Sequence, residues 1–159
     1  MPQRGIATLA VALMLSFLYL TNLEAEFFLL HLYQSSIYLA IVLMLIYFEE
    51  QYAYMLGMLA PAVWLGVTYG SGLLGVAARQ AGHLLEAQRP TNQVSVMTGI
   101  IAMLNVLMLA SCAYLWKREY AGLHKFGRTF AIGSVVVVLY YAGLIVAFWQ
   151  MTPGTLSAG

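Results

Sequence analysis

The sequence predicts an all-α fold, a bundle of five membrane-spanning helices, and three observations indicate it. Hydrophobic residues make up 62% of the chain and charged residues only 8%, whereas a soluble domain carries about 25% charged residues. The charged residues stand in short groups that separate long apolar stretches. Each stretch has about the twenty residues that a helix needs to cross a hydrocarbon core of roughly 30 Å. The predicted spans of this single transmembrane domain, residues 1–159, are 6–23, 27–48, 53–78, 96–116 and 129–150.

The first apolar stretch, residues 6–23, resembles the hydrophobic part of a signal peptide with a cleavage site after Ala25. Such sites need small residues shortly before the cut, and Leu23 is large. We therefore expect this helix to remain as the first span. A bundle of four spans is the alternative if the helix is removed or does not cross the membrane.

The second span, residues 27–48, carries polar side chains near its start. His31, Gln34, Ser35 and Tyr38 share one helical face, because residues three or four positions apart lie on the same side of a helix. The face continues in apolar form, so its polarity is confined to one half of the bilayer. Polar and ionisable side chains inside a span are functional candidates. We therefore select these four residues as a candidate cofactor-binding site.

Two acidic pairs flank this span: Glu24 and Glu26 precede it, and Glu49 and Glu50 follow it. Each pair stands just before a predicted helix. The positive end of the helix dipole stabilises carboxylates there, and we expect this to be their role. No Glu-x-x-His pattern occurs, so the sequence predicts no metal site.

The third span, residues 53–78, contains no charge and five glycines. Gly66, Gly70 and Gly75 give it small faces, and small residues let helices approach closely in lipid. We expect these three to be helix-packing positions and this helix to be the centre of the bundle. The alternative is that the glycines at 70–72 unwind the helix to line a site, as in transporters with broken helices.

Beyond Ala78 the sequence predicts that the helix continues to Arg89. Arg79, His83 and Glu86 share one face of this extension, a pattern typical of an amphipathic helix that lies in the membrane interface.

The fourth span, residues 96–116, has Asn105 near its midpoint. A buried amide in a membrane helix usually hydrogen-bonds a neighbouring helix, so we expect Asn105 to be an intramembrane polar contact. Contact with a substrate or ion is the alternative. Cys112, the only cysteine of the chain, excludes an internal disulfide and is expected to be a small packing residue.

Five spans place the termini on opposite sides of the membrane. Basic residues favour the cytoplasmic side, and an inner N-terminus puts five of them inside and two outside. The inner residues are Arg4, Lys117, Arg118, Lys125 and Arg128, and the outer ones are Arg79 and Arg89. We therefore predict N-terminus inside, C-terminus outside. The short loops suggest a bacterial inner membrane.

In this topology, residues of several spans reach the same outer depth as the His31 face. We expect Tyr69, Ser71 and Thr98, with His83 just beyond them, to converge there on one polar patch. The imidazole of His31 could ligate a haem or a chlorophyll-type pigment, or the patch could hydrogen-bond a quinone. An interface with another subunit, or a histidine satisfied by a neighbouring helix, is the alternative.

No catalytic motif is present, and a net charge of +1 without a basic stripe gives no case for nucleic-acid binding. We therefore expect a small non-catalytic membrane subunit of a larger assembly, such as an energy-converting or electron-transfer complex. Its partners are the lipid bilayer and other membrane subunits or further copies of the chain. A small oligomeric transporter or channel, and a haem-, pigment- or quinone-binding protein centred on His31, are the alternatives.

Overall fold

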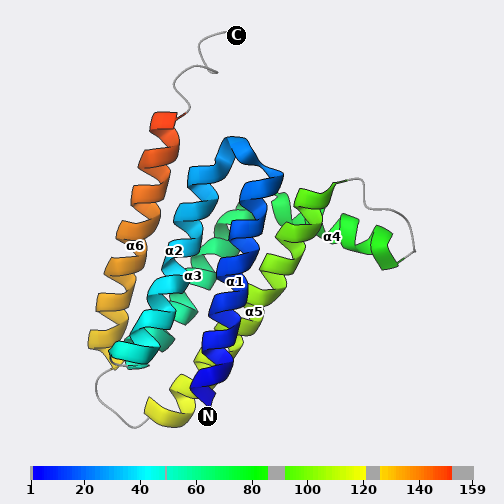
Figure 1. The fold of residues 1–159 in the computed structure, drawn as a ribbon. Helices are drawn as coiled ribbons and strands as arrows, with labels where there is room; N and C mark the ends of the chain where they lie inside the picture. The colour runs from blue at the N-terminus through cyan, green and yellow to red at the C-terminus, as the bar shows by residue number, and fades with distance from the viewer. Residues whose placement is uncertain (1, 49, 86–91, 121–125, 152–159) are drawn as a thin grey trace.

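The computed structural model describes residues 2–48, 50–85, 92–120 and 126–151, and nearly all of them are helical (Figure 1). The elements are α1 (Pro2–Leu23), the short 3₁₀ helix η1 (Ala25–Phe27), α2 (Phe28–Tyr47), α3 (Glu50–Gly70), α4 (Leu73–Leu85), α5 (Gln93–Tyr120) and α6 (Phe126–Met151). Among these described elements α1, α2, α3, α5 and α6 are long and apolar enough to cross a membrane. The predicted all-α membrane bundle is therefore confirmed.

The bundle has two distinct ends (Figure 1). The start of α1, the junction of α2 with α3, the end of α5 and the start of α6 lie at one end, which we call the N-terminal end. The opposite end, called the η1 end, holds η1, α4 and the last turns of α6. Helices α1 and α6 thus place the beginning and the end of the described chain at opposite ends, as an odd number of spans requires.

The third span differs from its prediction, since α3 covers Glu50–Gly70 and not residues 53–78. A tight turn ends it, in which Gly72 has a φ of +77°. Glycine adopts this left-handed conformation without the steric cost that other residues meet. Helix α4 begins directly after the turn and projects to the side of the bundle (Figure 1). The helix is therefore interrupted at residues 71–72, at the η1 end.

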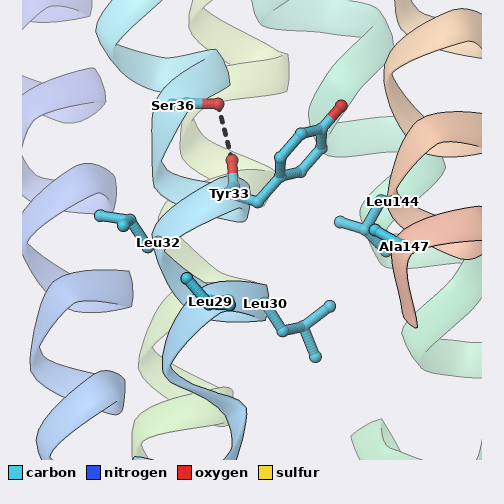
Figure 2. Close-up of a pocket in the computed structure, with 7 residues that line it drawn as sticks. All are labelled: Leu29, Leu30, Leu32, Tyr33, Ser36, Leu144 and Ala147. Atoms are coloured by element: carbon cyan, nitrogen blue, oxygen red, sulfur yellow. Dashed lines mark hydrogen bonds between the residues drawn. The ribbon is translucent and has the colours of Figure 1, made fainter. Parts of the chain in front are cut away.

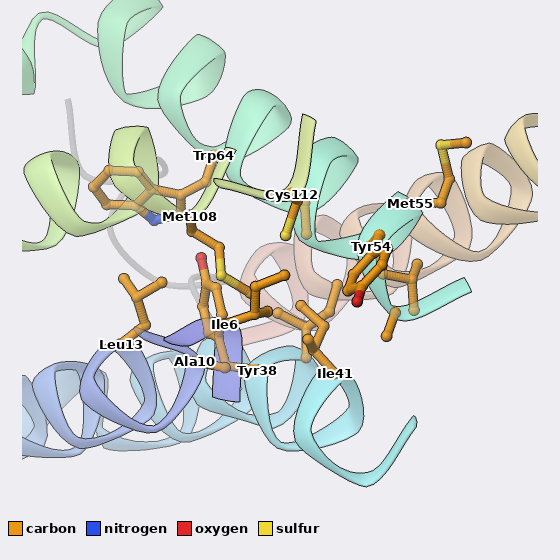
Figure 3. Close-up of a cluster of buried hydrophobic side chains, with 14 of the residues drawn as sticks. Ile6, Ala10, Leu13, Tyr38, Ile41, Tyr54, Met55, Trp64, Met108 and Cys112 are labelled. Atoms are coloured by element: carbon orange, nitrogen blue, oxygen red, sulfur yellow. The ribbon is translucent and has the colours of Figure 1, made fainter. Parts of the chain in front are cut away.

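Helices α1, α2, α3 and α5 supply most of the hydrophobic core (Figure 3). Helix α3 contacts α2, α4, α5 and α6 and is the most buried of the five spans. Its predicted central place is confirmed. The core side chains labelled in Figure 3 are Ile6, Ala10, Leu13, Tyr38, Ile41, Tyr54, Met55, Trp64, Met108 and Cys112.

The glycines chosen from the sequence are not the ones that bring helices of this chain together. Gly66, Gly70 and Gly75 are exposed, and among the described residues no atom other than those of their chain neighbours and local helix backbone stands within 4 Å of where their Cβ would be. As packing positions within the chain the three are therefore wrong. Their spacing put them on common faces, but it carried no information on whether those faces point inward or toward lipid.

Two other glycines permit the close contacts of α3. A Cβ on Gly57 would lie 2.5 Å from the Sγ atom of Cys112 on α5. A Cβ on Gly133 of α6 would lie 2.7 Å from Cγ of Met55. Both distances are shorter than a real Cβ contact allows. Because glycine has no Cβ, α5 and α6 can approach α3 this closely at Gly57 and Gly133. Cys112 is fully buried here and is the packing residue that the sequence predicts.

Helix α6 is the least buried span and is attached through a few specific contacts. Tyr33 of α2 and Tyr140 of α6 stack with ring centroids 4.7 Å apart. Each of their hydroxyl groups donates a hydrogen bond to the backbone carbonyl of the other residue, at 3.1 and 2.5 Å. Tyr141 donates to the carbonyl of Ala60 on α3 at 3.0 Å. Apolar grooves of about 420 and 330 Å³ remain along the seam, toward the η1 end and the N-terminal end respectively.

Candidate functional site

A partly open cavity of about 440 Å³ lies among the helices at the η1 end. Side chains from α1, α2, α3, α5 and α6 line it, together with residues beside η1 and the α3–α4 turn. Most of this lining is apolar and includes Phe17 and Trp64. The polar and ionisable lining residues are Glu24, His31, Gln34, Thr68, Ser71 and Thr98, with the tyrosine Tyr141.

The centre of the polar lining is a contact between His31 and Glu24. The Nε2 atom of His31 is 3.0 Å from a carboxylate oxygen of Glu24, and its Nδ1 atom is 3.4 Å from Oε1 of Gln34. His31 is only 7% exposed, so its ring nitrogens depend on these partners. A charged imidazolium donates to both oxygens. A neutral ring donates to Glu24 and accepts from the Gln34 amide once that amide is turned over.

The local fold places these residues together. Glu24 is the residue before η1 and makes no side-chain capping bond there. His31 follows seven positions later, in the first turn of α2, and the short η1 between them leaves the Glu24 carboxylate within reach of the imidazole. Gln34 is one turn further along α2.

The acidic residues thus behave differently from one another. Glu26 and Glu50 stand in the first turns of η1 and α3, as expected for carboxylates near helix starts. Glu50 also accepts hydrogen bonds from the Gln3 amide and, at 3.4 Å, from the Tyr54 hydroxyl. For Glu24 the expected role is wrong, because its carboxylate contacts His31. Glu49 lies outside the described residues.

Three hydroxyl groups of the cavity are turned to their own helices. Thr68 donates to the carbonyl of Trp64 at 2.7 Å, Ser71 to that of Thr68 at 3.0 Å, and Thr98 to that of Val94 at 2.9 Å. A hydroxyl that donates its proton keeps oxygen lone pairs for accepting. The cavity wall therefore offers mainly hydrogen-bond acceptors to a molecule inside it.

The predicted outer patch is only partly assembled. His31, Gln34, Ser71 and Thr98 do meet in this cavity. Tyr69 does not, because it is 78% exposed on the outside of α3. The side chain of His83, like Glu86 and Arg89 nearby, lies outside the described residues.

The remaining two residues of the His31 face lie apart from the cavity. Ser35 is buried and donates to the carbonyl of Leu32 at 2.7 Å. Tyr38 stacks on Phe17, with ring centroids 5.7 Å apart, and its hydroxyl donates to Oδ1 of Asn105 at 2.6 Å. They are structural residues of the interior and are not part of the cavity lining.

Asn105 makes the interhelical hydrogen bond that the sequence predicts. Its side chain is fully buried on α5, accepts from Tyr38 of α2 and donates from Nδ2 to the carbonyl of Ile101 at 2.9 Å. With these partners inside the core, Asn105 lines none of the three cavities described above.

Sequence reasoning missed Glu24, Trp64 and Tyr141 as residues of the site. A signal existed for Glu24, because a spacing of seven from His31 puts the two on one side of a helix. Trp64 and Tyr141 have no such signal, since their place depends on how α3 and α6 lie against α2.

The geometry favours hydrogen bonding over metal ligation at His31. Both ring nitrogens already face an oxygen atom, so an iron or magnesium ligand bond would displace Glu24 or Gln34. Among the described residues no three His, Cys, Asp or Glu side chains form a group that could hold a metal ion. The haem and pigment hypotheses therefore fit these residues less well than a molecule with a hydrogen-bonding head.

Comparison of the chain with protein-family models, curated proteins and solved structures found no match. The function must therefore be inferred from the chemistry of the residues themselves.

Proposed function

We propose that the protein is a small non-catalytic membrane protein that binds a lipid-soluble molecule in the η1-end cavity. The observation that carries the proposal is the contact between His31 and Glu24 on the wall of that cavity. His31 is buried within a candidate span, and an ionisable side chain in such a place is commonly retained for function. Glu24, whose side chain is one-third exposed, meets it from the turn between α1 and η1. A mostly apolar cavity with a few convergent polar groups is the usual form of a small-molecule site.

The cavity suits the polar head of such a molecule. Its volume of about 440 Å³ is within the range of about 300–1,000 Å³ that small-molecule sites occupy. Phe17 and Trp64 supply apolar walls. The Glu24 carboxylate and the Gln34 amide, both in contact with His31, supply hydrogen-bonding groups at one side. The reduced, quinol form of a quinone is one head group of this kind, because its hydroxyl groups donate hydrogen bonds.

The proposal is tested by identifying the compound that co-purifies with the protein. Protein extracted in mild detergent should carry a lipophilic compound that mass spectrometry identifies. His31→Ala should lower its occupancy about tenfold or more, because it removes the contact that positions the Glu24 carboxylate, and a hydrogen bond to a charged group contributes about 1.5–3 kcal/mol. Thr8→Ala is the control, since Thr8 is exposed and its hydroxyl bonds the carbonyl of Arg4, far from the cavity lining. Equal occupancy in wild type and His31→Ala would refute the proposal.

A second observation favours membership of a larger assembly. Ala62, Gly66 and Gly70 are spaced four residues apart on α3 and are exposed. No described atom faces the two glycines within 4 Å, so a helix of another subunit, or of a second copy, has room to pack there closely.

Gly66→Leu tests this second function. It should leave the thermal stability of the isolated chain unchanged and should reduce the size of the particle extracted from native membranes. Val67→Leu, an exposed position next to it, is the matched control. If the Gly66→Leu particle has the same size as the wild-type particle, the protein does not assemble through this face.

The orientation with the N-terminus inside a bacterial inner membrane belongs to the same proposal. It is supported by the basic residues of the described chain. Arg4, Lys117, Arg118 and Arg128 lie on the segments at the N-terminal end, and Arg79 lies on α4 at the η1 end. Basic residues are retained on the cytoplasmic side.

A further inference from the structure

The groove between α2 and α6 adjoins the η1-end cavity. It has a volume of about 420 Å³ and is almost wholly apolar (Figure 2). Its polar side chains are Ser36, which donates to the carbonyl of Tyr33 at 2.7 Å, and Tyr33 itself. The groove therefore offers a surface for hydrocarbon.

Two leucine residues belong to both hollows. Leu30 of α2 and Leu144 of α6 line the groove and also line the cavity that contains His31. These two side chains therefore form the boundary between an apolar groove and a polar cavity. Together the hollows have the shape of a site for an amphiphile, with the head on one side of the leucines and the chain on the other.

Specific contacts keep the groove open. Tyr33 and Tyr140 hold α2 to α6 by their stacked rings and paired hydrogen bonds. Gly143 leaves room for this arrangement, since a Cβ there would lie 3.0 Å from the Tyr33 hydroxyl. The two helices are thus fixed beside the groove at a set separation.

The charges of the lining select the head group. Neither hollow has a lysine or arginine among its described lining residues, and the charged groups are Glu24 and, when protonated, His31. A phosphate or carboxylate would meet the Glu24 carboxylate without a free cation to pair with, which is unfavourable in a site of low polarity. The oxygens of Thr68, Ser71 and Thr98 favour a head that donates hydrogen bonds.

We propose that the ligand is a single-chain lipid with an uncharged, hydroxyl-bearing head. The head lies in the η1-end cavity against Glu24 and His31, and the chain passes between Leu30 and Leu144 into the groove of α2 and α6. The ligand reaches the site laterally, from the bilayer. This inference rests on the proposed function and names the ligand class of the same site.

Binding in phosphatidylcholine nanodiscs, measured by native mass spectrometry, tests the inference. The probes are 1-monooleoylglycerol, its short-chain analogue 1-monooctanoylglycerol, and oleate. We expect one molecule of monooleoylglycerol per chain and at least tenfold weaker binding of oleate. Oleate that binds as well as monooleoylglycerol would overturn the head-group assignment.

The path of the chain is tested by filling the groove. Ala147→Phe adds a ring to a residue that lines the groove but not the cavity. The variant should bind monooleoylglycerol at least fivefold more weakly than wild type. Its affinity for monooctanoylglycerol should stay within twofold of wild type. Val136→Phe is the control, since it fills the second groove at the N-terminal end. If the two variants bind monooleoylglycerol equally, the chain does not use the α2–α6 groove.

His31→Ala separates this inference from the proposed function. It should weaken both glycerides, because both place their heads against His31. If neither glyceride binds the wild type, the inference is wrong. The proposed function is judged separately, by whether His31→Ala loses the compound that co-purifies with the wild type.

Discussion

A single hydrogen bond between two buried side chains joins α2 to α5 in the interior of the bundle. Tyr38 and Asn105 are both essentially fully buried, and the hydroxyl of one donates to the amide oxygen of the other at 2.6 Å. The second bond of Asn105, to the carbonyl of Ile101, stays within α5. The link from α2 to α5 therefore depends on one hydroxyl group.

Tyr38→Phe should lower the free energy of unfolding in detergent by about 1–2 kcal/mol, because it leaves the buried amide oxygen of Asn105 without a donor. Tyr38→Phe combined with Asn105→Leu should cost less than the two single changes together, since the orphaned amide is removed. Thermal unfolding of the four proteins measures the difference. Tyr114→Phe, an exposed position on α5, should have no effect. Strictly additive losses would show that Tyr38 and Asn105 are not coupled.

What the sequence reveals at this scale depends on the residue. Asn105 could be assigned from its type and depth alone, because an amide inside a span needs a partner whatever the fold. The partner, Tyr38, could not be named, since it lies on a helix that is distant in sequence. For the candidate site, His31 and Gln34 were found from polarity, while Glu24 was explained by a helix end and its contact with His31 was missed.

At the scale of helices, a glycine brings two helices of this chain close together only where another helix faces it. Gly57 faces Cys112 of α5, whereas the exposed Gly66, about two and a half turns further along α3, has open space where a Cβ would be. The sequence shows both as glycines of one apolar span. It contains no signal that distinguishes an inward face from a lipid face in a helix that is apolar on all sides.

Gly57→Ala should destabilise the bundle by about 1–3 kcal/mol, the usual cost of overpacking, because its Cβ would lie 2.5 Å from Sγ of Cys112. Gly66→Ala should be neutral or stabilising by up to about 1 kcal/mol, since alanine favours helix more than glycine does. Adding Cys112→Ala to Gly57→Ala should recover part of the loss by removing the clashing sulfur. Melting temperatures in one detergent compare the variants. An equal loss for Gly57→Ala and Gly66→Ala would contradict the assignment of the faces.

At the scale of the whole molecule, burial and hydropathy run in opposite directions. Among the five candidate spans, α3 is the least hydropathic and the most buried, and α6 is the most hydropathic and the least buried. A helix that faces lipid gains from apolar side chains all round, whereas a helix at the centre can exchange them for small and polar residues that pack. Hydropathy thus predicts that five helices span the membrane. Hydropathy does not predict how α6 attaches to the bundle or that a groove forms beside Tyr33, because both depend on contacts between helices that are distant in sequence.

The orientation of the bundle in the membrane is a property of the whole molecule. Cys112, the only cysteine, is fully buried, so labelling by an impermeant maleimide should report introduced cysteines with little background. Asn92→Cys at the η1 end and Arg118→Cys at the N-terminal end are both exposed positions. In spheroplasts we expect Asn92→Cys to be labelled directly and Arg118→Cys only after lysis, because the basic end is retained in the cytoplasm. The unsubstituted protein gives the background. The reverse pattern would place the N-terminal end outside, and the His31 cavity would then lie in the inner leaflet.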